Sequence, residues 1–249
     1  MKLSKIIIGT LFVASAMFAS EDANHWGYTG HNTPEKWGDM DTKNVMCKLG
    51  HNQSPINIEK DIEIDSKNLA PIAFNYVSGS SNVVDNGHTV QVNIKDGSSI
   101  KIDGKVFELK QFHFHTPSEN EIDSKHFPLE AHFVHMAKDG SLAVVAVLFE
   151  DGKENPLLHK VWAKMPHEAG KKSSISLTSK EINAFLPKDK SYYRFDGSLT
   201  TPPCSEGVRW FVLKSYDTVS KGQVEQFLHV MHHPNNRPIQ NIGARKVLD

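Results

Sequence analysis

The chain has 249 residues, of which 39% are hydrophobic and 23% are charged, and its formal net charge is −1. This composition is typical of a globular protein with one substantial core, and it excludes a disordered or fibrous chain. The near-neutral charge gives no basic footprint for nucleic acid and no polybasic patch for an anionic membrane, so we expect a small-molecule substrate.

An export signal is predicted at the amino terminus. Lys2 and Lys5 precede an apolar run over residues 6–18, which is too short to cross a bilayer. We therefore interpret residues 1–20 as a cleaved signal peptide whose exact cleavage site stays open. No repeat, linker or longer apolar run divides residues 21–249, so we expect a single domain without a membrane span, in a periplasmic or secreted protein.

The chain contains two cysteines, Cys47 and Cys204. An even pair in an exported chain favours a disulfide over two buried thiols. In the chain-entropy model, a bridge that closes so long a loop stabilises the fold by about 4–5 kcal/mol. It would also restrain the segment after Pro202-Pro203.

Strand patterns dominate the middle of the chain. Residues 90–94 and 100–102 alternate apolar and polar side chains, and Asp96-Gly97 between them predicts a hairpin turn. Asp103-Gly104 then leads into a further strand over residues 106–109. Residues 142–149 form a continuous apolar run after the turn Asp139-Gly140, which is typical of a central strand buried on both faces.

Helical patterns are short and peripheral. They cover residues 155–165 and 220–231, and Ser220 is able to cap the second helix. We therefore predict a mainly β, single-domain fold built on a large, mostly antiparallel twisted central sheet with short peripheral helices.

The most informative motif is the segment 111–115, with the sequence Gln-Phe-His-Phe-His. Alternate side chains of an extended strand share a face, so Gln111, His113 and His115 point to one side and the two phenylalanines to the other. One face of this strand therefore carries polar side chains that lie close together, and the other face packs into the hydrophobic core.

The segment 130–135 repeats this scheme. Glu130, His132 and Val134 share one strand face, whereas His135 lies on the opposite face. Three neutral imidazoles leave zinc a fourth position open to water, which is typical of a catalytic zinc site. Each histidine taken alone could equally be a hydrogen-bonded residue of a half-exposed strand.

Several segments in the same order resemble the α-class carbonic anhydrases, particularly the exported bacterial ones. The resemblance spans nearly the whole chain after the signal peptide and rests on Trp26-Gly27-Tyr28, Gln53-Ser54-Pro55-Ile56-Asn57-Ile58, Asn86-Gly87-His88, residues 111–115, residues 130–135, Gly197-Ser198-Leu199-Thr200-Thr201-Pro202-Pro203 and Asn236-Arg237-Pro238. It implies a zinc-dependent enzyme that reversibly hydrates carbon dioxide to bicarbonate and a proton, by attack of zinc-bound hydroxide.

The resemblance implies that His113, His115 and His132 hold Zn²⁺ and that His135 is a core residue. Zinc-bound histidines usually donate their other ring proton to an outer acceptor. Gln111 and Glu130 each precede a ligand on the same strand face and could accept that proton from His113 and His132. They could instead form only hydrogen bonds at the strand surface.

The resemblance also implies how the nucleophile is oriented. Zinc brings the pKa of its bound water to about 7, an effect for which carbonic anhydrase itself is the standard example. Thr200 would accept a hydrogen bond from the resulting hydroxide and donate one to Glu119. The Thr200 backbone N–H and Thr201 would contact substrate oxygen. Both threonines could instead be ordinary loop residues.

The remaining implied residues bind the substrate or move the proton. Carbon dioxide has no net dipole, and an apolar wall of Val134, Val144, Leu199, Val208 and Trp210 matches the family, although the valines could equally be core residues. His88 matches the proton shuttle, with Tyr28, Asn86 and Gln111 ordering the water chain. His88 could instead be a surface histidine after a turn.

Two positions depart from the pattern of many relatives. Asn120 stands where many have histidine, and Phe195 where several have tyrosine. We expect altered local packing there and no loss of catalysis. Two other functions stay open: a catalytically silent binding module on the same fold, and a zinc hydrolase of activated esters. A homodimer is possible, because dimers are common among the bacterial relatives that the chain resembles.

Overall fold

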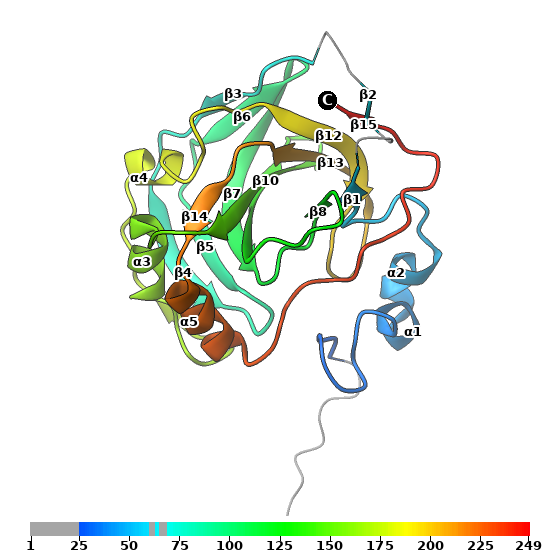
Figure 1. Cartoon of the computed structure of the whole chain (residues 1–249), viewed down its shortest axis with the longest axis horizontal. Coiled ribbons are helices and arrows are strands. Elements are labelled where there is room, and N and C mark those ends of the chain that lie inside the picture. The colour runs from blue at the N-terminus through cyan, green and yellow to red at the C-terminus, as the bar shows by residue number, and fades with distance from the viewer. Residues whose placement is uncertain (1–24, 60–62, 65–68) are drawn as a thin grey trace, which may run out of the picture.

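The computed structural model of the chain describes residues 25–59, 63–64 and 69–249, so the predicted signal peptide lies outside the described residues (Figure 1). The helices are α1 (Trp37–Met40), α2 (Met46–Leu49), α3 (Pro156–Trp162), α4 (Ser179–Asn183) and α5 (Lys221–Met231), with a 3-10 turn at Thr42–Asn44. The strands are β1 (Asn57–Ile58), β2 (Glu63–Ile64), β3 (Ala73–Asn75), β4 (Ser80–Asp85), β5 (Val90–Ile94), β6 (Ser99–Ile102), β7 (Lys105–His115), β8 (Glu121–Ile122), β9 (Leu129–Met136), β10 (Leu142–Asp151), β11 (Lys172–Ser173), β12 (Tyr192–Ser198), β13 (Glu206–Leu213), β14 (Asp217–Val219) and β15 (Val247–Leu248). No helix among the described residues is long and apolar enough to cross a membrane.

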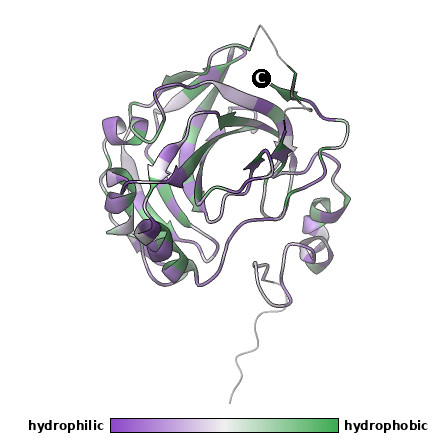
Figure 2. Ribbon diagram, in the orientation of Figure 1, coloured by the Kyte–Doolittle hydropathy of each residue, from purple (hydrophilic) through white to green (hydrophobic). Residues whose placement is uncertain are grey.

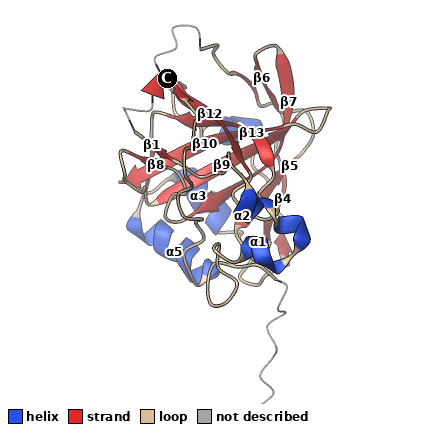
Figure 3. Cartoon of the chain, turned by 90° about the vertical axis from the view of Figure 1, so that its right-hand side faces the viewer, coloured by secondary structure: helices blue, strands red, loops and turns tan. Residues whose placement is uncertain are grey.

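One large twisted sheet dominates the molecule, with helices at its periphery (Figure 3). Its strand order is β11-β4-β5-β7-β9-β10-β13-β12-β15-β2, with β14, β3 and β6 joined to it off this path. Most neighbours are antiparallel, but β10 pairs in parallel with both β13 and β14, so the sheet is mixed at its centre. The predicted mainly β single domain is confirmed.

The strand β10 is central and buried on both faces, as its continuous apolar run predicts. Val145, Val147 and Phe149 point into the larger core, which lies between the sheet and helices α3, α4 and α5. Val144, Ala146 and Leu148 point into a second apolar cluster on the opposite face. Figure 2 shows the hydrophobic residues concentrated along these central strands. Each fully buried side chain of this size contributes roughly 1.5–3 kcal/mol.

The hairpin predicted at Asp96-Gly97 is wrong. Strands β5 and β6 do not pair with each other. They pair instead with different parts of the long strand β7, β5 with residues 111–113 and β6 with residues 105–108. The backbone N–H of Lys95 instead donates to the Gly79 carbonyl. The two-residue turn is at Asp103-Gly104, where both residues have the positive φ that a type I′ turn requires, 50° and 76°, and where Ile102 faces Lys105.

The two longer helices begin where the capping residues indicate. The Asn155 side chain accepts from the first backbone N–H groups of α3, which ends at Trp162 and is shorter than predicted. Ser220 forms a capping box with Gln223 at the start of α5. Helix α4, which the sequence analysis did not predict, begins with a similar box of Thr178 and Glu181.

Candidate metal centre

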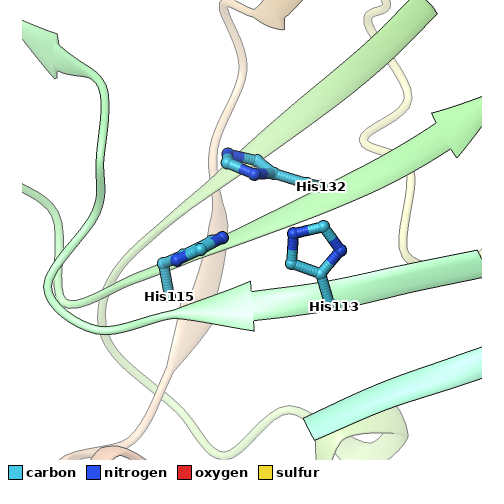
Figure 4. A group of neighbouring side chains, drawn as sticks. All are labelled: His113, His115 and His132. Carbon is cyan, nitrogen blue, oxygen red and sulfur yellow. The ribbon is translucent and has the colours of Figure 1, made fainter. Parts of the chain in front are cut away.

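Strands β7 and β9 bring the predicted metal ligands together. In the antiparallel register His113 lies opposite His132, and His115 lies on the same face as His113. One ligand nitrogen from each of His113, His115 and His132 lies within 4.8 Å of the others. Figure 4 shows the rings converging from the two strands. His135 lies on the other face, where its Nε2 accepts from the Tyr76 hydroxyl at 2.8 Å.

Each histidine ring has an outer partner that fixes its orientation. His113 Nδ1 is 2.8 Å from the Gln111 side-chain oxygen, and His132 Nε2 is 2.9 Å from Glu130 Oε1, as the alternation pattern indicates. His115 Nδ1 donates to the backbone carbonyl of Asn235 at 2.7 Å. The opposite nitrogens therefore face the centre. Among the described residues, the buried His115 Nε2 has no hydrogen-bond partner, so its lone pair is available to a metal ion.

The charge states of these side chains suit metal binding. Burial, followed by the nearby His115 and His132, holds the pKa of His113 well below its ordinary value. Burial also lowers the pKa of His115, although its hydrogen bond to the Asn235 carbonyl opposes this effect. Both rings are therefore neutral at pH 7, which is the form that binds a metal.

Glu130 is a buried carboxylate that stays charged. Burial alone would raise its pKa, but the charge of His132 and hydrogen bonds from His132 and Asn120 outweigh burial and lower the pKa. A charged acceptor at this position makes His132 a stronger electron donor toward a metal.

Glu119 lies beside the open nitrogens. Its Oε1 accepts from the backbone N–H of Arg237 at 2.9 Å, and its Oε2 is 3.5 Å from His115 Nε2. Burial raises the pKa of Glu119 to about 7, while the charge of His132 and a hydrogen bond with the Thr200 side chain oppose the rise. The predicted pair of Thr200 and Glu119 is therefore brought together at the candidate metal centre.

The loop that carries Thr200 connects β12 to β13, and a disulfide and two hydrogen bonds hold its two ends in place. The Cys47–Cys204 disulfide is present, with an S–S distance of 2.04 Å. Gln53 Nε2 donates to the Cys204 carbonyl at 3.0 Å. Trp210 Nε1 donates to the Ser198 carbonyl at 3.0 Å, which ties the start of the loop to β13.

A cavity of about 120 Å³ opens beside the histidines. Its lining includes these residues that the sequence analysis assigned to the site: Tyr28, Asn86, His88, Gln111, His113, His115 and Thr201. Three further residues that were not predicted from the sequence as site residues also line the cavity: Trp26, Thr89 and Gln91. Gln91 could have been suspected from the sequence, because it lies on the polar face of an alternating strand. In the structure it pairs with His113 in the neighbouring strand.

The apolar residues assigned to a substrate wall also gather on this face of the sheet. They belong to or pack against the second apolar cluster and comprise Val134, Val144, Leu199, Val208 and Trp210. The Trp210 ring contacts the His132 ring, with 4.9 Å between centroids. The polar and apolar halves of the predicted site therefore meet at His132.

His88 lies between this cavity and an outer pocket of about 330 Å³, because it lines both. Its ring is half-buried and stacks on Trp26, with 3.5 Å between centroids. Asn86 Oδ1 accepts from the His88 backbone N–H at 2.9 Å and so shapes the turn. In this position burial, followed by the nearby His25 and His233, lowers the pKa of His88 to about 4.

Comparison with known proteins decides the family. A family model described as eukaryotic-type carbonic anhydrase matches residues 32–249. The chain belongs to the α-carbonic anhydrase family. The predicted fold family and enzyme class are thereby confirmed.

Bacterial relatives of this carbonic anhydrase chain cover it almost completely. The carbonic anhydrase of Pectobacterium atrosepticum is 44% identical over 98% of this chain and 98% of its own. That of Klebsiella pneumoniae is 46% identical over 96% of each chain. The solved α-carbonic anhydrase of Thermovibrio ammonificans, in complex with the inhibitor sulfanilamide, is 49% identical, with a TM-score of 0.86 over 90% of this chain and 99% of that one.

The two departures from the family pattern have different surroundings. Asn120 Nδ2 donates to Glu130 Oε1 at 2.7 Å, so a side-chain N–H still reaches this carboxylate. The Phe195 ring lies parallel to Trp210, at 6.0 Å between centroids, within the second apolar cluster. The expected change in local packing therefore includes a hydrogen bond that the sequence analysis did not foresee.

Proposed function

We propose that this chain is a zinc-dependent carbonic anhydrase that interconverts carbon dioxide and water with bicarbonate and a proton. One observation carries the proposal: imidazole nitrogens of His113, His115 and His132 converge beside the Glu119–Thr200 pair. Family membership makes carbon dioxide hydration the reaction that this geometry fits best.

His113, His115 and His132 would hold Zn²⁺, with Gln111, the Asn235 carbonyl and Glu130 fixing their rings. When bound, zinc lowers the pKa of water so that hydroxide is available near neutral pH. Imidazole ligands suit zinc, and a complete set without a protein carboxylate or thiolate leaves room for water.

Thr200 and Glu119 orient the attacking oxygen. The Thr200 hydroxyl would donate to the Glu119 carboxylate, which would leave its own oxygen to accept a hydrogen bond from the nucleophile. This arrangement selects one direction of attack on carbon dioxide. Val134, Val144, Leu199, Val208 and Trp210 supply apolar contact for a substrate that has no net dipole, and Thr201 with the Thr200 backbone N–H meets its oxygens.

The released proton leaves through the cavity. Tyr28, Asn86 and Gln111 line it and would order the water between the centre and His88. The stacked His88 ring has a low pKa because it is half-buried. Exposure of the ring to cavity water would bring its pKa back toward neutrality, where imidazole transfers protons well.

The Cys47–Cys204 disulfide supports an oxidising compartment, so we place the enzyme in the periplasm or outside the cell. The signal peptide over residues 1–20 and a homodimer are further parts of this proposal.

Stopped-flow measurement of carbon dioxide hydration, beside hydrolysis of an aryl ester by the same zinc-loaded protein, tests the proposal. We expect carbon dioxide to be turned over far faster than the ester. Ester hydrolysis alone would instead indicate a zinc hydrolase of activated esters, and the absence of both activities would indicate a silent binding module.

A further inference from the structure

The Glu130 carboxylate connects two parts of the centre. Its Oε1 is 2.9 Å from His132 Nε2, while its Oε2 accepts the backbone N–H groups of Glu119 at 2.7 Å and of Asn120 at 2.9 Å. The Glu130 side chain has no exposed surface. A buried carboxylate is held by the donors around it, so these contacts fix both its position and its orientation.

Asn120 supplies the remaining side-chain contact. Its Nδ2 donates to Glu130 Oε1 at 2.7 Å, and its Oδ1 accepts from the backbone N–H of Ile56 at 3.4 Å. Asn120 is also completely buried, and Ser118 Oγ donates to its carbonyl at 2.7 Å. The Nδ2 and Oδ1 atoms of the Asn120 side chain therefore each have a hydrogen-bond partner, and the side chain connects Glu130 to the segment that contains Ile56.

Because this bridge already satisfies the Asn120 amide, residue 195 does not have to supply a hydrogen-bonding group and can be phenylalanine. Ile56 and Phe195 belong to the same apolar cluster, which also contains Trp210. The Asn120 amide finds its acceptor in Glu130 and its donor in a backbone N–H, so it requires no hydroxyl from residue 195. An imidazole at position 120 would have a second ring nitrogen to satisfy in this apolar surrounding.

We propose that Asn120 is a positioning residue for the metal centre: its amide holds Glu130 in the orientation that fixes His132. The inference rests on the proposed function, because it assigns Asn120 an effect on zinc binding. The same carboxylate also restrains Glu119 through its backbone N–H.

The test compares zinc release from variants of the zinc-loaded mature protein in excess chelator. Asn120→Leu keeps the branched shape of the side chain, with larger methyl groups at its end, but removes its donor and its acceptor. Direct outer partners of zinc ligands typically change metal affinity by about 10–100-fold. Because Asn120 acts through one such partner, Glu130, we expect zinc release to be at least about threefold faster. The visible spectrum of the cobalt-substituted variant should also shift, because His132 is held differently.

Asn155→Leu is the matched control. Asn155 is also buried and also hydrogen-bonded, but it caps α3 on the opposite face of the sheet. This variant should lose thermal stability while releasing zinc within about threefold of the wild-type rate. The double variant Asn120→His/Phe195→Tyr restores an N–H donor and a hydroxyl, and should release zinc at least about threefold more slowly than Asn120→Leu.

Release from Asn120→Leu within threefold of wild type, or equally fast release from Asn120→Leu and the double variant, would overturn the inference. If Asn120→Leu does not fold, Asn120→Ser replaces it under the same criteria, because its side chain is too short to reach Glu130. An active, zinc-loaded wild type with unchanged release from Asn120→Leu contradicts only the inference. A wild type that holds no zinc contradicts the proposed function as well.

Discussion

At the scale of single residues, strand parity separates His132 from His135. They lie on opposite faces of β9, one beside the converging imidazoles and one against Tyr76 in the larger core. We expect His132→Ala to lose bound zinc and carbon dioxide hydration, and His135→Ala to keep zinc but lose about 1–3 kcal/mol of folding free energy. Metal analysis, hydration rates and urea unfolding check this. Retention of zinc by His132→Ala together with loss of zinc from folded His135→Ala would reverse the assignment.

Burial of His135 also makes the fold sensitive to acid. Burial lowers its pKa to about 3, although the Ala143 carbonyl opposes this shift, whereas the unfolded chain titrates near 6.5. Below pH 6.5 the unfolded state therefore binds a proton that the folded state does not, and stability falls toward pH 3 by about 1.4 kcal/mol per pH unit.

Urea unfolding of the wild type and His135→Gln between pH 7.5 and about 5 measures this effect. We expect the free energy of unfolding of the wild type to fall more steeply with acid than that of the variant. Parallel pH profiles would show that His135 is not the residue responsible.

His88 tests the proton path independently of metal binding. His88→Ala should slow steady-state hydration in weak buffer while zinc content and the interconversion of carbon dioxide and bicarbonate at equilibrium stay nearly unchanged. Added imidazole should restore part of the rate, because a diffusible base can replace the tethered one. Full turnover of the variant in weak buffer, or loss of its zinc, would return His88 to a structural role.

Side-chain alternation predicts which strand face carries each of the three histidines and two of their partners, Gln111 and Glu130, because strand parity is local. The family resemblance then assigns the histidines as metal ligands. The partners from the end of the chain could not be predicted. His115 uses the backbone carbonyl of Asn235, and Glu119 uses the backbone N–H of Arg237. Nearly every residue has the same backbone N–H and C=O groups, so a sequence pattern cannot single out these two partners. They are identified only by the way in which the folded chain brings them beside His115 and Glu119.

At the scale of elements, the loop between β12 and β13 sets the position of Thr200. The disulfide joins this loop to Cys47 across 157 residues of sequence. We expect reduction to lower stability by up to about 4–5 kcal/mol and to lower the hydration rate before global unfolding.

Urea unfolding and hydration assays with and without a thiol reductant measure both effects of reducing the disulfide. Cys47→Ser/Cys204→Ser serves as the control, because the reductant should not change it further. Two free thiols in the mass spectrum of the non-reduced mature protein would rule out the bridge.

Two of the chain's Asp-Gly pairs show why local sequence patterns do not determine the order of the strands in the sheet. Asp96-Gly97 and Asp103-Gly104 have the same turn signal, but only the second closes a hairpin. At the first, β5 and β6 both pair with β7, whose length allows it to accept two partners one after the other. Turn chemistry indicates where the chain bends, and non-local pairing decides which strands meet.

At the scale of the whole molecule, the central sheet has the larger hydrophobic core on one face and the candidate metal centre on the other. One face carries the larger core under α3, α4 and α5, and the other carries the histidines, the cavity and the second apolar cluster. Both faces of β10 contribute, so its apolar run predicts a central strand without indicating which face holds the site. The polar residues of β7 and β9 supply that information.

The central claim is that His113, His115 and His132 form one zinc site that is required for hydration. The most direct measurement is a zinc titration of the metal-free mature protein, with stopped-flow carbon dioxide hydration recorded at each addition and His132→Ala as the control. We expect negligible activity without metal, a linear rise that ends at one zinc per chain, and no rise in the control. Full activity in the metal-free protein, or stoichiometric zinc binding at these histidines without hydration, would contradict the account.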